Sequence, residues 1–353
     1  MPETNNPTTT ATEMVLPGKV AATGLRATRR TLPAPTAGQA LVRVEAAAVS
    51  FAESAMRRGR YYGQPAFPFV PGYDLAGVVE AVGPDVDRAL VGKRVASLTK
   101  TGAWATAVVL DAADLVEVPD GVSAEEAETV TVNGLTAYQM LHRAKVQAGQ
   151  TVLVLGVAGG VGTLLTQLAR HAGARVIGTA NPRHHEALRE LGVEPIDYRD
   201  PDISARVREL APDGVDAVFD HLGGASVSVS YKLLNRTGTL ISYSIASKLD
   251  DTTPVLLSFL NVLTKLAFWN HLPTGRHASF YDVWSGAGKP GSAKRDEFRA
   301  RIRTDLTHVF TLLRDGVLTA KIAARYPLTE VAAAMELSES SGRTTLGKII
   351  LIP

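Results

Sequence analysis

Four closely spaced glycines are the residues whose type and spacing point most clearly to chemistry. Gly156, Gly159, Gly160 and Gly162 directly follow an apolar run, Val152 to Leu155. Without side chains at these positions, backbone N–H groups can approach a phosphate closely, and a helix can pack tightly against the preceding strand. The pattern therefore indicates a turn that holds the phosphates of a dinucleotide.

The elements needed to position such a turn are present on both sides of it. The unbroken aliphatic run before the glycines predicts a strand covered on both faces. A second strand, from Arg175 to Gly178, follows the helix stop at Gly173, and the residues between the two strands have apolar positions at helical spacing: Leu164, Leu165, Leu168 and Ala169. This order predicts a βαβ unit with a pyrophosphate at the helix N-terminus. Because Val157 replaces one glycine of the usual G-x-G-x-x-G, the alternative is a tight turn that binds nothing.

The residues after the second strand favour one cofactor. An NAD site would offer an acidic residue about 20 residues past the glycines. This chain has Asn181 and Arg183 there, and an arginine can pair with the 2′-phosphate of NADPH. We therefore predict NADPH, although Arg183 could also belong to a solvated loop, and the nearby Glu186 keeps the choice open.

Composition excludes several other classes of protein. The 353 residues carry a net charge of only +2 and no cysteine, so we expect no nucleic-acid partner, no disulfide and no thiolate zinc site. The first 15 residues are polar and lack the features of a signal peptide, so we expect a frayed tail and a cytoplasmic protein. No apolar run reaches about 18 residues, so we expect no membrane-spanning helix.

The chain divides into two structural patterns. Short alternating runs such as 40–44 and 77–82, broken by proline and glycine up to about Pro119, predict a small β-barrel. A helical pattern follows from Ala124 to Leu141, which Asn133 and Gly134 are expected to interrupt. Strands and helices then alternate from 151 to 243, as in a doubly wound parallel sheet.

Four segments together carry a family resemblance. They are SFAESAMRRGRYYGQPAFPFVPGYDLAGVVEAVG (50–83), VNGLTAYQML (132–141), VLVLGVAGGVGTLLTQLAR (152–170) and YPLTEVAAAMELSESSGRTTLGKIILIP (326–353). The chain resembles the zinc-independent quinone oxidoreductases of the medium-chain dehydrogenase/reductase superfamily, including the vesicle amine transport protein-like branch. The resemblance implies an α/β fold with a GroES-like β-barrel catalytic domain, residues 1–132 and 286–353, and a Rossmann NADPH-binding domain, residues 133–285. It also suggests a homodimer.

The resemblance also implies a reaction without metal. Alcohol dehydrogenases of the superfamily bind catalytic zinc through a cysteine and a G-H-E histidine, and this chain has Ser50 or its neighbours and Tyr73-Asp74 in those places. Because a simple alcohol is a poor acid, alcohol oxidation without zinc is disfavoured. Reduction of a quinone or an α,β-unsaturated carbonyl needs only hydrogen-bond donors and a proton.

Three residues of the first segment are candidates for that catalytic work. Tyr61 matches a tyrosine that the family places near the substrate, and Tyr62 is next to it; aromatic packing under a proline-rich loop is the alternative. Ser50 stands where the family has asparagine and could bond substrate or cofactor, or simply end a strand. For Glu53 we favour a capping residue or an ion pair with Arg57 over a proton relay.

Further cofactor contacts follow from the matched motifs. Tyr198 corresponds to a tyrosine beside the 2′-phosphate, and Arg343 to a late basic contact that could equally be a solvated charge. Thr136 is expected at the nicotinamide, with helix capping as the alternative. The full set of predicted cofactor-binding residues is Thr136, Gly156, Gly159, Gly160, Val161, Gly162, Asn181, Arg183, Tyr198, His221, Tyr243, Ser244 and Arg343.

Three functions remain open on this basis. The leading hypothesis is an NADPH-dependent, metal-independent reductase of a small-molecule quinone or enone. The first alternative is an enoyl thioester reductase or a tailoring reductase of secondary metabolism, and the second is a protein that binds NADPH without catalysis. The apolar segment Pro254 to Trp269 could be a wall for a bulky substrate or a buried interface helix.

Overall fold

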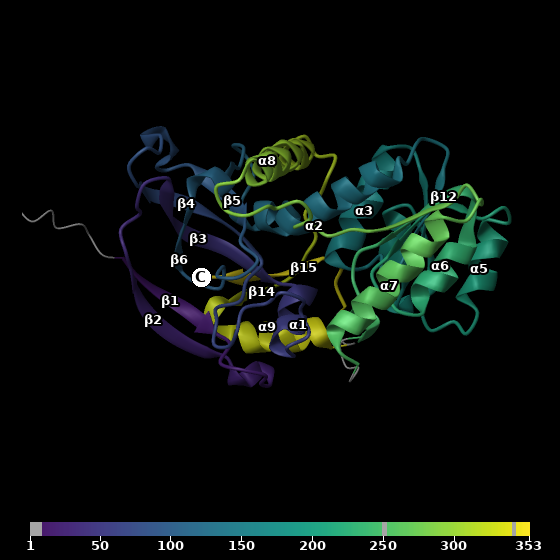
Figure 1. Cartoon of the computed structure of the whole chain (residues 1–353), viewed down its shortest axis with the longest axis horizontal. Coiled ribbons are helices and arrows are strands. Elements are labelled where there is room, and N and C mark those ends of the chain that lie inside the picture. The colour runs from purple at the N-terminus through teal and green to yellow at the C-terminus, as the bar shows by residue number, and fades with distance from the viewer. Residues whose placement is uncertain (1–8, 249–252, 341–343) are drawn as a thin grey trace, which may run out of the picture.

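The structure, a computed structural model, describes residues 9–248, 253–340 and 344–353. The described residues form a six-stranded parallel sheet and a seven-stranded curved, barrel-like sheet, which lie side by side (Figure 1), and a separate two-stranded sheet. This arrangement confirms the predicted fold class. It places the glycine-rich turn and the N-terminal tyrosines on facing sides of a cleft.

The parallel sheet holds the nucleotide-type unit. Its strands lie in the order β10-β9-β8-β11-β12-β13, and every neighbouring pair is parallel. Their bounds are β8 (Thr151–Val154), β9 (Arg175–Ala180), β10 (Val193–Asp197), β11 (Val215–Asp220), β12 (Leu234–Ser242) and β13 (His277–Phe280). The order reverses between β8 and β11. In open α/β sheets, ligands bind outside the carboxyl ends of the strands at such a reversal.

Helices cover both faces of this sheet. They are α3 (Gly160–His171), α4 (His185–Glu190), α5 (Ile203–Leu210), α6 (Ser226–Leu233) and α7 (Val255–Asn270). The central strand residues Leu153, Val218 and Phe219 are fully buried, because both faces of β8 and β11 are covered. This explains why their sequence reads as continuous apolar runs instead of alternating ones.

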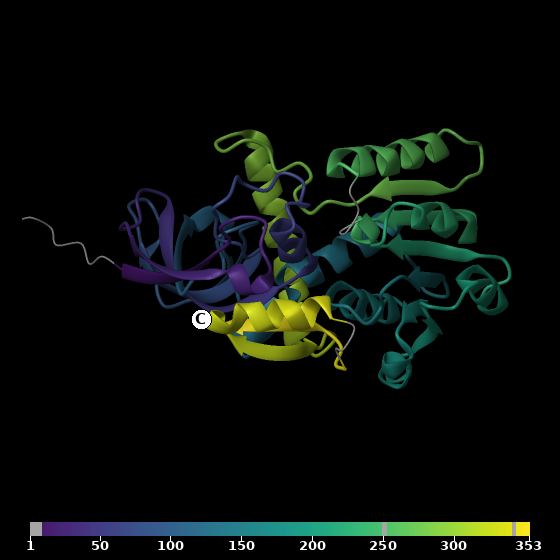
Figure 2. The ribbon, with the colours of Figure 1, turned by 90° about the horizontal axis from the view of Figure 1, so that it is seen from below.

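The second sheet is made from two distant parts of the chain. It contains β3 (Gln39–Val49), β4 (Asp74–Val82), β5 (Arg94–Leu98), β6 (Ala107–Asp111), β7 (Val116–Glu117), β14 (Ile322–Pro327) and β15 (Lys348–Ile352). β15 lies between β14 and β3, so the C-terminal segment completes the sheet that the N-terminal part begins. Figure 2 shows this segment, with α9 (Val331–Glu339), against the N-terminal strands.

The N-terminal segment differs from the prediction. The expected frayed tail up to residue 15 is wrong for its second half, because Thr9–Val15 forms β1 and pairs antiparallel with β2 (Arg26–Leu32). The backbone of β1 also bonds to the barrel: Met14 N–H donates to Trp104 O at 2.9 Å. Pairing partners far along the chain therefore order a segment whose polar composition suggested none.

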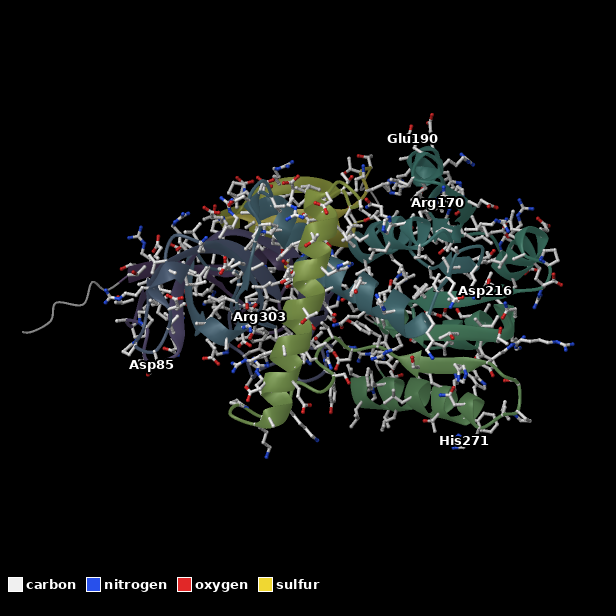
Figure 3. The ribbon with its side chains drawn as sticks, turned by 90° about the horizontal axis from the view of Figure 1, so that it is seen from above. Asp85, Arg170, Glu190, Asp216, His271 and Arg303 are labelled. Atoms are coloured by element: carbon white, nitrogen blue, oxygen red, sulfur yellow. The ribbon has the colours of Figure 1, made fainter. Side chains whose placement is uncertain are left out.

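Helix α2 (Ala124–Ala144) connects the two sheets, and it is continuous. Ser123 and Glu126 form a capping box at its start. The expected interruption at Asn133 and Gly134 is wrong. A β-carbon at Gly134 would lie 2.8 Å from Val309 Cγ1 of α8 (Ala293–Arg314), so the glycine permits close helix packing and does not end a helix. Figure 3 shows α8 running along the outside, with Arg303 labelled on it.

A buried charge cluster ties the last strand to this helix. Lys348 Nζ lies 2.9 Å from Asp74 Oδ2 and 2.9 Å from Glu128 Oε1. All three side chains are at most 2% exposed. Asp74 also accepts a hydrogen bond from the Val132 N–H at 2.9 Å. We refer to Lys348, Asp74 and Glu128 as the buried ionic cluster; it joins β15, β4 and α2 at the back of the cleft.

Candidate active site

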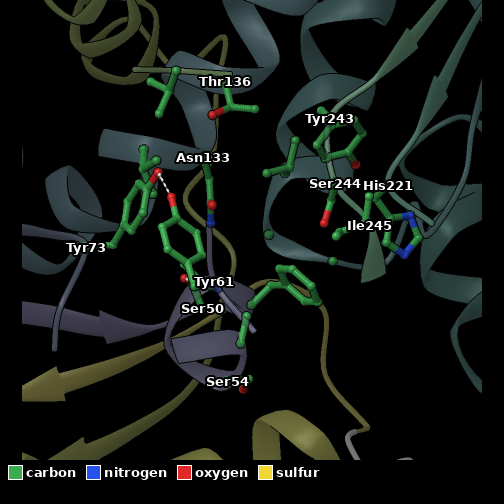
Figure 4. A pocket seen from close by; sticks show the side chains of 18 of the residues that line it. Ser50, Ser54, Tyr61, Tyr73, Asn133, Thr136, His221, Tyr243, Ser244 and Ile245 are labelled. Carbon is green, nitrogen blue, oxygen red and sulfur yellow. Dashed lines mark hydrogen bonds between the residues drawn. The ribbon is translucent and has the colours of Figure 1, made fainter. Parts of the chain in front are cut away.

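A cleft of about 760 Å³ separates the carboxyl edge of the parallel sheet from the barrel. Figure 4 shows Tyr61 and Tyr73 on one side of it, His221, Tyr243 and Ser244 on the other, and Asn133 between them. Most of the predicted site residues line this cleft: Ser50, Tyr61, Tyr62, Thr136, Gly156, Gly159, Gly160, Val161, Gly162, His221, Tyr243 and Ser244.

The glycine-rich turn has the geometry of a phosphate cradle. Gly156 has φ +66°, a conformation that other residues rarely adopt. Gly159 is the N-cap of α3 and offers no side chain to the N–H groups of the first turn. Those groups have no acceptor within the helix. Val161 and Gly162 of this first turn line the cleft, so its backbone donors can meet an anion.

Two neighbouring glycines in this turn should differ in their tolerance of a side chain. A β-carbon at Gly162 would lie 2.6 Å from Gly156 O and 2.7 Å from Val157 Cα, which are backbone atoms. We expect Gly162→Ala to lower the free energy of unfolding by about 1–3 kcal/mol, the usual range for overpacking. Urea denaturation followed by circular dichroism measures this change.

Gly160→Ala is the matched control. Its β-carbon would meet the Asn133 amide nitrogen at 2.3 Å, which is the end of a side chain that can rotate away. Because alanine also favours a helix, this variant should keep or slightly raise the stability. Equal losses for both variants would contradict our account of the turn.

His221 lies directly against the turn. Its Nδ1 is 3.1 Å from Leu155 O. Because a carbonyl only accepts, Nδ1 carries the proton in neutral His221, and Nε2 is left as an acceptor. Burial lowers the pKa of His221, although Asp220 and the bond to Leu155 oppose this shift. Burial raises the pKa of the neighbouring Tyr243. The next residue, Ser244, has a buried hydroxyl without a hydrogen-bond partner. A neutral acceptor and an unpaired hydroxyl suit the polar edge of a ribose or an amide.

The lowered pKa of His221 predicts acid sensitivity. The unfolded chain binds a proton at this histidine near its ordinary pKa of about 6.5, but the folded protein binds it only at lower pH. The stability that His221 contributes is therefore present above about pH 6.5 and is lost as the pH falls through the folded-state pKa. Urea midpoints at pH 7.5 and 5.5 should differ less in His221→Gln than in the unmodified protein. The same substitution at the exposed His277 should leave the difference unchanged.

The residues predicted to hold a 2′-phosphate gather outside the cleft. Asn181 and Arg183 follow β9, where Asn181 Oδ1 accepts the Arg183 N–H at 3.2 Å. Tyr198 follows β10 and is 49% exposed, and its N–H donates to Ala180 O at 3.1 Å. These three residues thus share the carboxyl end of two adjacent strands. Arg343 lies outside the described residues.

On the barrel side, Ser50 and Glu53 form a helix cap. Ser50 is the N-cap of α1 (Phe51–Arg57): its hydroxyl accepts the Ala52 N–H at 3.1 Å, and its own N–H donates to Glu53 Oε2 at 2.9 Å. The capping prediction for Glu53 is confirmed. The predicted ion pair with Arg57 is wrong, because Arg57 pairs with Glu339 of α9 at 2.6 Å. Burial raises the pKa of Glu53, while the bond from Ser50 opposes this shift.

Tyr61 belongs to a chain of hydrogen-bonded side chains. Its hydroxyl oxygen lies 2.7 Å from that of Tyr73, and Trp284 Nε1 donates to Tyr73 Oη at 2.6 Å. Burial raises the pKa of both tyrosines, so both phenols are protonated at neutral pH. This chain of contacts favours a hydrogen-bonding role for Tyr61 over simple packing.

Tyr62 has a different environment. It is 62% exposed, and its ring stacks on Phe259 of α7 at a centroid distance of 5.9 Å. Phe259 in turn contacts Phe280 edge-on at 4.6 Å. One face of α7 thus forms an apolar wall of the cleft, as one of the two sequence hypotheses for this segment proposed. Other α7 side chains, including Leu256, Leu257, Leu260 and Phe268, face outward.

Among the cleft residues that were not predicted are Asn133, Tyr73 and Trp284. Asn133 precedes Thr136 by three positions on α2, so helical spacing could have found it once the helix was known to be continuous. Thr136 itself lies in mid-helix, so it cannot be the helix-capping threonine considered above. The sequence marks Tyr73 only by its place at a metal-ligand position of the related alcohol dehydrogenases. Trp284 follows β13, and no motif marks it.

Among the described residues, no group of three or more histidine, cysteine, aspartate or glutamate side chains is arranged to hold a metal ion. Within the same part of the chain, no helix has the length and apolar composition needed to cross a membrane.

Two family matches cover most strands of the barrel sheet and most strands of the parallel sheet. Residues 36–120 match the family described as alcohol dehydrogenase GroES-like domain, and residues 160–284 match the family described as zinc-binding dehydrogenase. The structure is similar to Escherichia coli quinone oxidoreductase complexed with NADPH, with a TM-score of 0.81, 26% identity and coverage of 98% of this chain and 100% of that one. Pseudomonas syringae quinone oxidoreductase gives a TM-score of 0.81 at 30% identity, covering 97% and 100%.

The sequence relatives include two groups of proteins. The synaptic vesicle membrane protein VAT-1 homolog of Danio rerio is 34% identical over 330 residues, which is 90% of this chain but only 65% of that protein. Its counterpart in Rattus norvegicus is 33% identical, over 91% of this chain and 78% of that protein. A mycocerosic acid synthase-like polyketide synthase of Mycobacterium tuberculosis is 32% identical over 95% of this chain. The aligned region makes up only 15% of that synthase.

Proposed function

Because the chain belongs to the medium-chain dehydrogenase/reductase superfamily, in its quinone oxidoreductase-like branch, we propose that it is an NADPH-dependent, metal-independent reductase of quinones or α,β-unsaturated carbonyls. The observation that carries this proposal is the single cleft that holds both the glycine-rich turn and the Tyr61 hydroxyl. One wall has backbone donors for a phosphate, and the other has a phenol that can polarise a carbonyl.

The residues on the sheet side fit NADPH. The first turn of α3 would receive the pyrophosphate, since its N–H groups have no side-chain cap and its residues Val161 and Gly162 line the cleft. The unpaired Ser244 hydroxyl and the acceptor Nε2 of His221 would meet the ribose and nicotinamide region. Asn181, Arg183 and Tyr198 would surround the 2′-phosphate. When bound, NADPH supplies a hydride.

The residues on the barrel side provide what the substrate then needs. As an enone or quinone accepts the electron pair, negative charge gathers on its carbonyl oxygen. A phenol such as Tyr61 can donate a hydrogen bond to that oxygen without adding charge of its own and can then deliver a proton. The apolar side chains of α7 and the Tyr62 ring would exclude water from the reacting atoms.

Steady-state oxidation of NADPH tests this function. We expect turnover with a panel of quinones and enones and no dependence on added zinc or on a chelator. An absence of turnover with every substrate, despite tight NADPH binding, would contradict the proposal and favour a non-catalytic binding protein.

A thioester reductase is the second candidate, and the mycobacterial synthase match favours it. That alignment covers nearly the whole chain, so a domain of this kind stands within a protein named as a polyketide synthase. The same hydride and proton chemistry would act on the conjugated double bond of an enoyl thioester. Turnover with enoyl thioesters but not with quinones would decide for this candidate.

The cofactor preference depends on Arg183. We expect Arg183→Ala to lower the affinity for NADPH relative to NADH by about tenfold or more, the range for a hydrogen bond to a charged group. Calorimetric titration with both nucleotides measures the ratio. Arg189→Ala, at an exposed position of α4, is the control, and an unchanged ratio in Arg183→Ala would show that the loop does not read the 2′-phosphate.

Three sequence predictions stay proposals. The domain boundaries at 132/133 and 285/286 are one of them, and the first falls inside the continuous helix α2. The homodimer and the cytoplasmic location are the others.

A further inference from the structure

The direction of the hydrogen bonds between Tyr61 and Tyr73 has a chemical consequence. Two phenols 2.7 Å apart can share one hydrogen bond in either direction. If Tyr73 donates to Tyr61, the hydrogen of Tyr61 stays free for a ligand in the cleft. If Tyr61 donates to Tyr73, that hydrogen is consumed inside the protein. Figure 4 shows the pair at the edge of the cleft.

The hydrogen bond from Trp284 determines the direction of the bond between Tyr61 and Tyr73. An indole N–H only donates, so its 2.6 Å contact with Tyr73 Oη uses an acceptor position of that oxygen. Were Tyr61 also to donate to Tyr73, the Tyr73 oxygen would accept twice, and its own hydrogen would need a third partner. Tyr73 is only 6% exposed, and the described residues offer its hydroxyl no third partner. Buried hydroxyl hydrogens without acceptors are rare, so the direction from Tyr73 to Tyr61 is favoured.

The position of Trp284 is itself fixed. Its ring stacks on Phe298 of α8 at 5.8 Å and meets the Tyr73 ring at 6.0 Å. The backbone N–H of Trp284 donates to Asp282 Oδ1 at 3.0 Å, and this bond holds the loop after β13. The indole therefore has little freedom to leave Tyr73.

We propose that Trp284 and Tyr73 are positioning residues that point the hydroxyl hydrogen of Tyr61 into the cleft, where it meets the carbonyl oxygen of the ligand. This inference rests on the proposed function and deepens it, because it names the two residues that orient the Tyr61 hydrogen toward the carbonyl oxygen. Neither Trp284 nor Tyr73 transfers a proton to the ligand. Trp284 ends the series of hydrogen bonds on the protein side. After Tyr61 has given its proton to the ligand, it therefore takes a new proton from the cleft side.

An aldehyde dye tests the inference without catalysis. The absorption of 4-dimethylaminocinnamaldehyde moves to longer wavelength when its carbonyl oxygen accepts a hydrogen bond. With NADPH left out, the dye is not reduced, so the shift and the dissociation constant come from one titration. We expect a red shift with the unmodified protein, none with Tyr61→Phe, and a reduced shift with Trp284→Phe and with Tyr73→Phe.

Trp269→Phe is the matched control. This indole stacks on Tyr231 in the parallel-sheet unit, so the substitution should leave the shift unchanged.

Kinetics add a second readout. Trp284→Phe should lower kcat by about tenfold, the loss of one hydrogen bond of ordinary strength. Combined with Tyr61→Phe it should cause no additional loss, since it acts through Tyr61.

The outcomes separate the inference from the proposed function. An unchanged shift in Trp284→Phe, or fully additive losses of kcat, would overturn the inference while leaving a reductase function intact. A normal pattern of shifts in a protein that turns over no substrate would support the inference and overturn the reductase function. No red shift in the unmodified protein at saturating dye would overturn the inference.

Discussion

Replacing Lys348 by methionine is expected to lower the free energy of unfolding by about 3–5 kcal/mol, the range for removing one partner of a buried ion pair. Lys348 is the cation of the buried ionic cluster, within 2.9 Å of both Asp74 and Glu128. Without it, two carboxylates remain in a site that water does not reach. Chemical denaturation followed by circular dichroism gives the change.

The free energy of unfolding that Lys348→Met removes should increase with pH. Burial and the neighbouring Asp74 already raise the pKa of Glu128, and Lys348 opposes this shift. In Lys348→Met one carboxyl has to bind a proton in the folded state, so its folded pKa lies above its unfolded value. Stability is then present at low pH and is lost as the pH rises through the folded pKa.

Two further variants complete this test. Lys232→Met, at an exposed position of α6, should change the stability by less than about 0.5 kcal/mol. Adding Glu128→Gln to Lys348→Met should restore part of the loss, because it removes one of the two carboxylates. A fully stable Lys348→Met would mean that the cluster does not hold β15 to α2.

The largest effect on activity is expected from Tyr61→Phe. If the Tyr61 hydroxyl stabilises the charge on the carbonyl oxygen, its loss should lower kcat by about 10²- to 10³-fold, the range found for one oxyanion donor. The ring is kept, so packing against Tyr73 should persist. The affinity for NADPH should stay within about twofold, because the tyrosine faces the substrate and not the phosphates.

Stopped-flow reduction of one quinone and one enone at saturating NADPH measures this rate directly. Tyr326→Phe, on β14 and away from the cleft, is the control for a lost phenol hydroxyl. An unchanged rate in Tyr61→Phe would return this residue to a packing role. A weakened affinity for NADPH with an unchanged rate would instead place it at the cofactor.

Local patterns in the sequence predicted the parallel sheet well, because residues close together in the sequence mark each of its strands and helices. The aliphatic run before Gly156 reads as buried since β8 has neighbours on both sides and helices on both faces. The predicted alternation of strands and helices from 151 to 243 is confirmed, for example by helix α5 (Ile203–Leu210) followed by strand β11 (Val215–Asp220). The failures depend on distant partners. Gly134 stays helical because α8 packs there, and Thr9–Val15 is a strand because β2 and Trp104 lie beside it.

The same distinction applies to the site. Glycine spacing and the strand ends placed one wall of the cleft, and a family motif pointed to Tyr61. The partners of Tyr61 could not be found in this way, since Trp284 is 211 positions from Tyr73 and belongs to no motif. The ionic partners of Lys348 are likewise remote, with Asp74 274 positions away. A charged residue in an apolar C-terminal strand was the one available signal of a buried partner.

The place of β15 between β14 and β3 affects how the chain can fold during its synthesis. Ile349 pairs with Val49, so β3 waits for a neighbour made roughly 300 residues later, which takes about 15–60 s at ordinary translation rates. During that time the parallel-sheet unit can emerge complete, while the end of β3 from Ala47 to Val49 exposes an unpaired edge, because β6 covers only the other end, Gln39 to Arg43. Nascent chains stalled before residue 348 should therefore recruit chaperones at the barrel strands and already resist protease between β8 and β13.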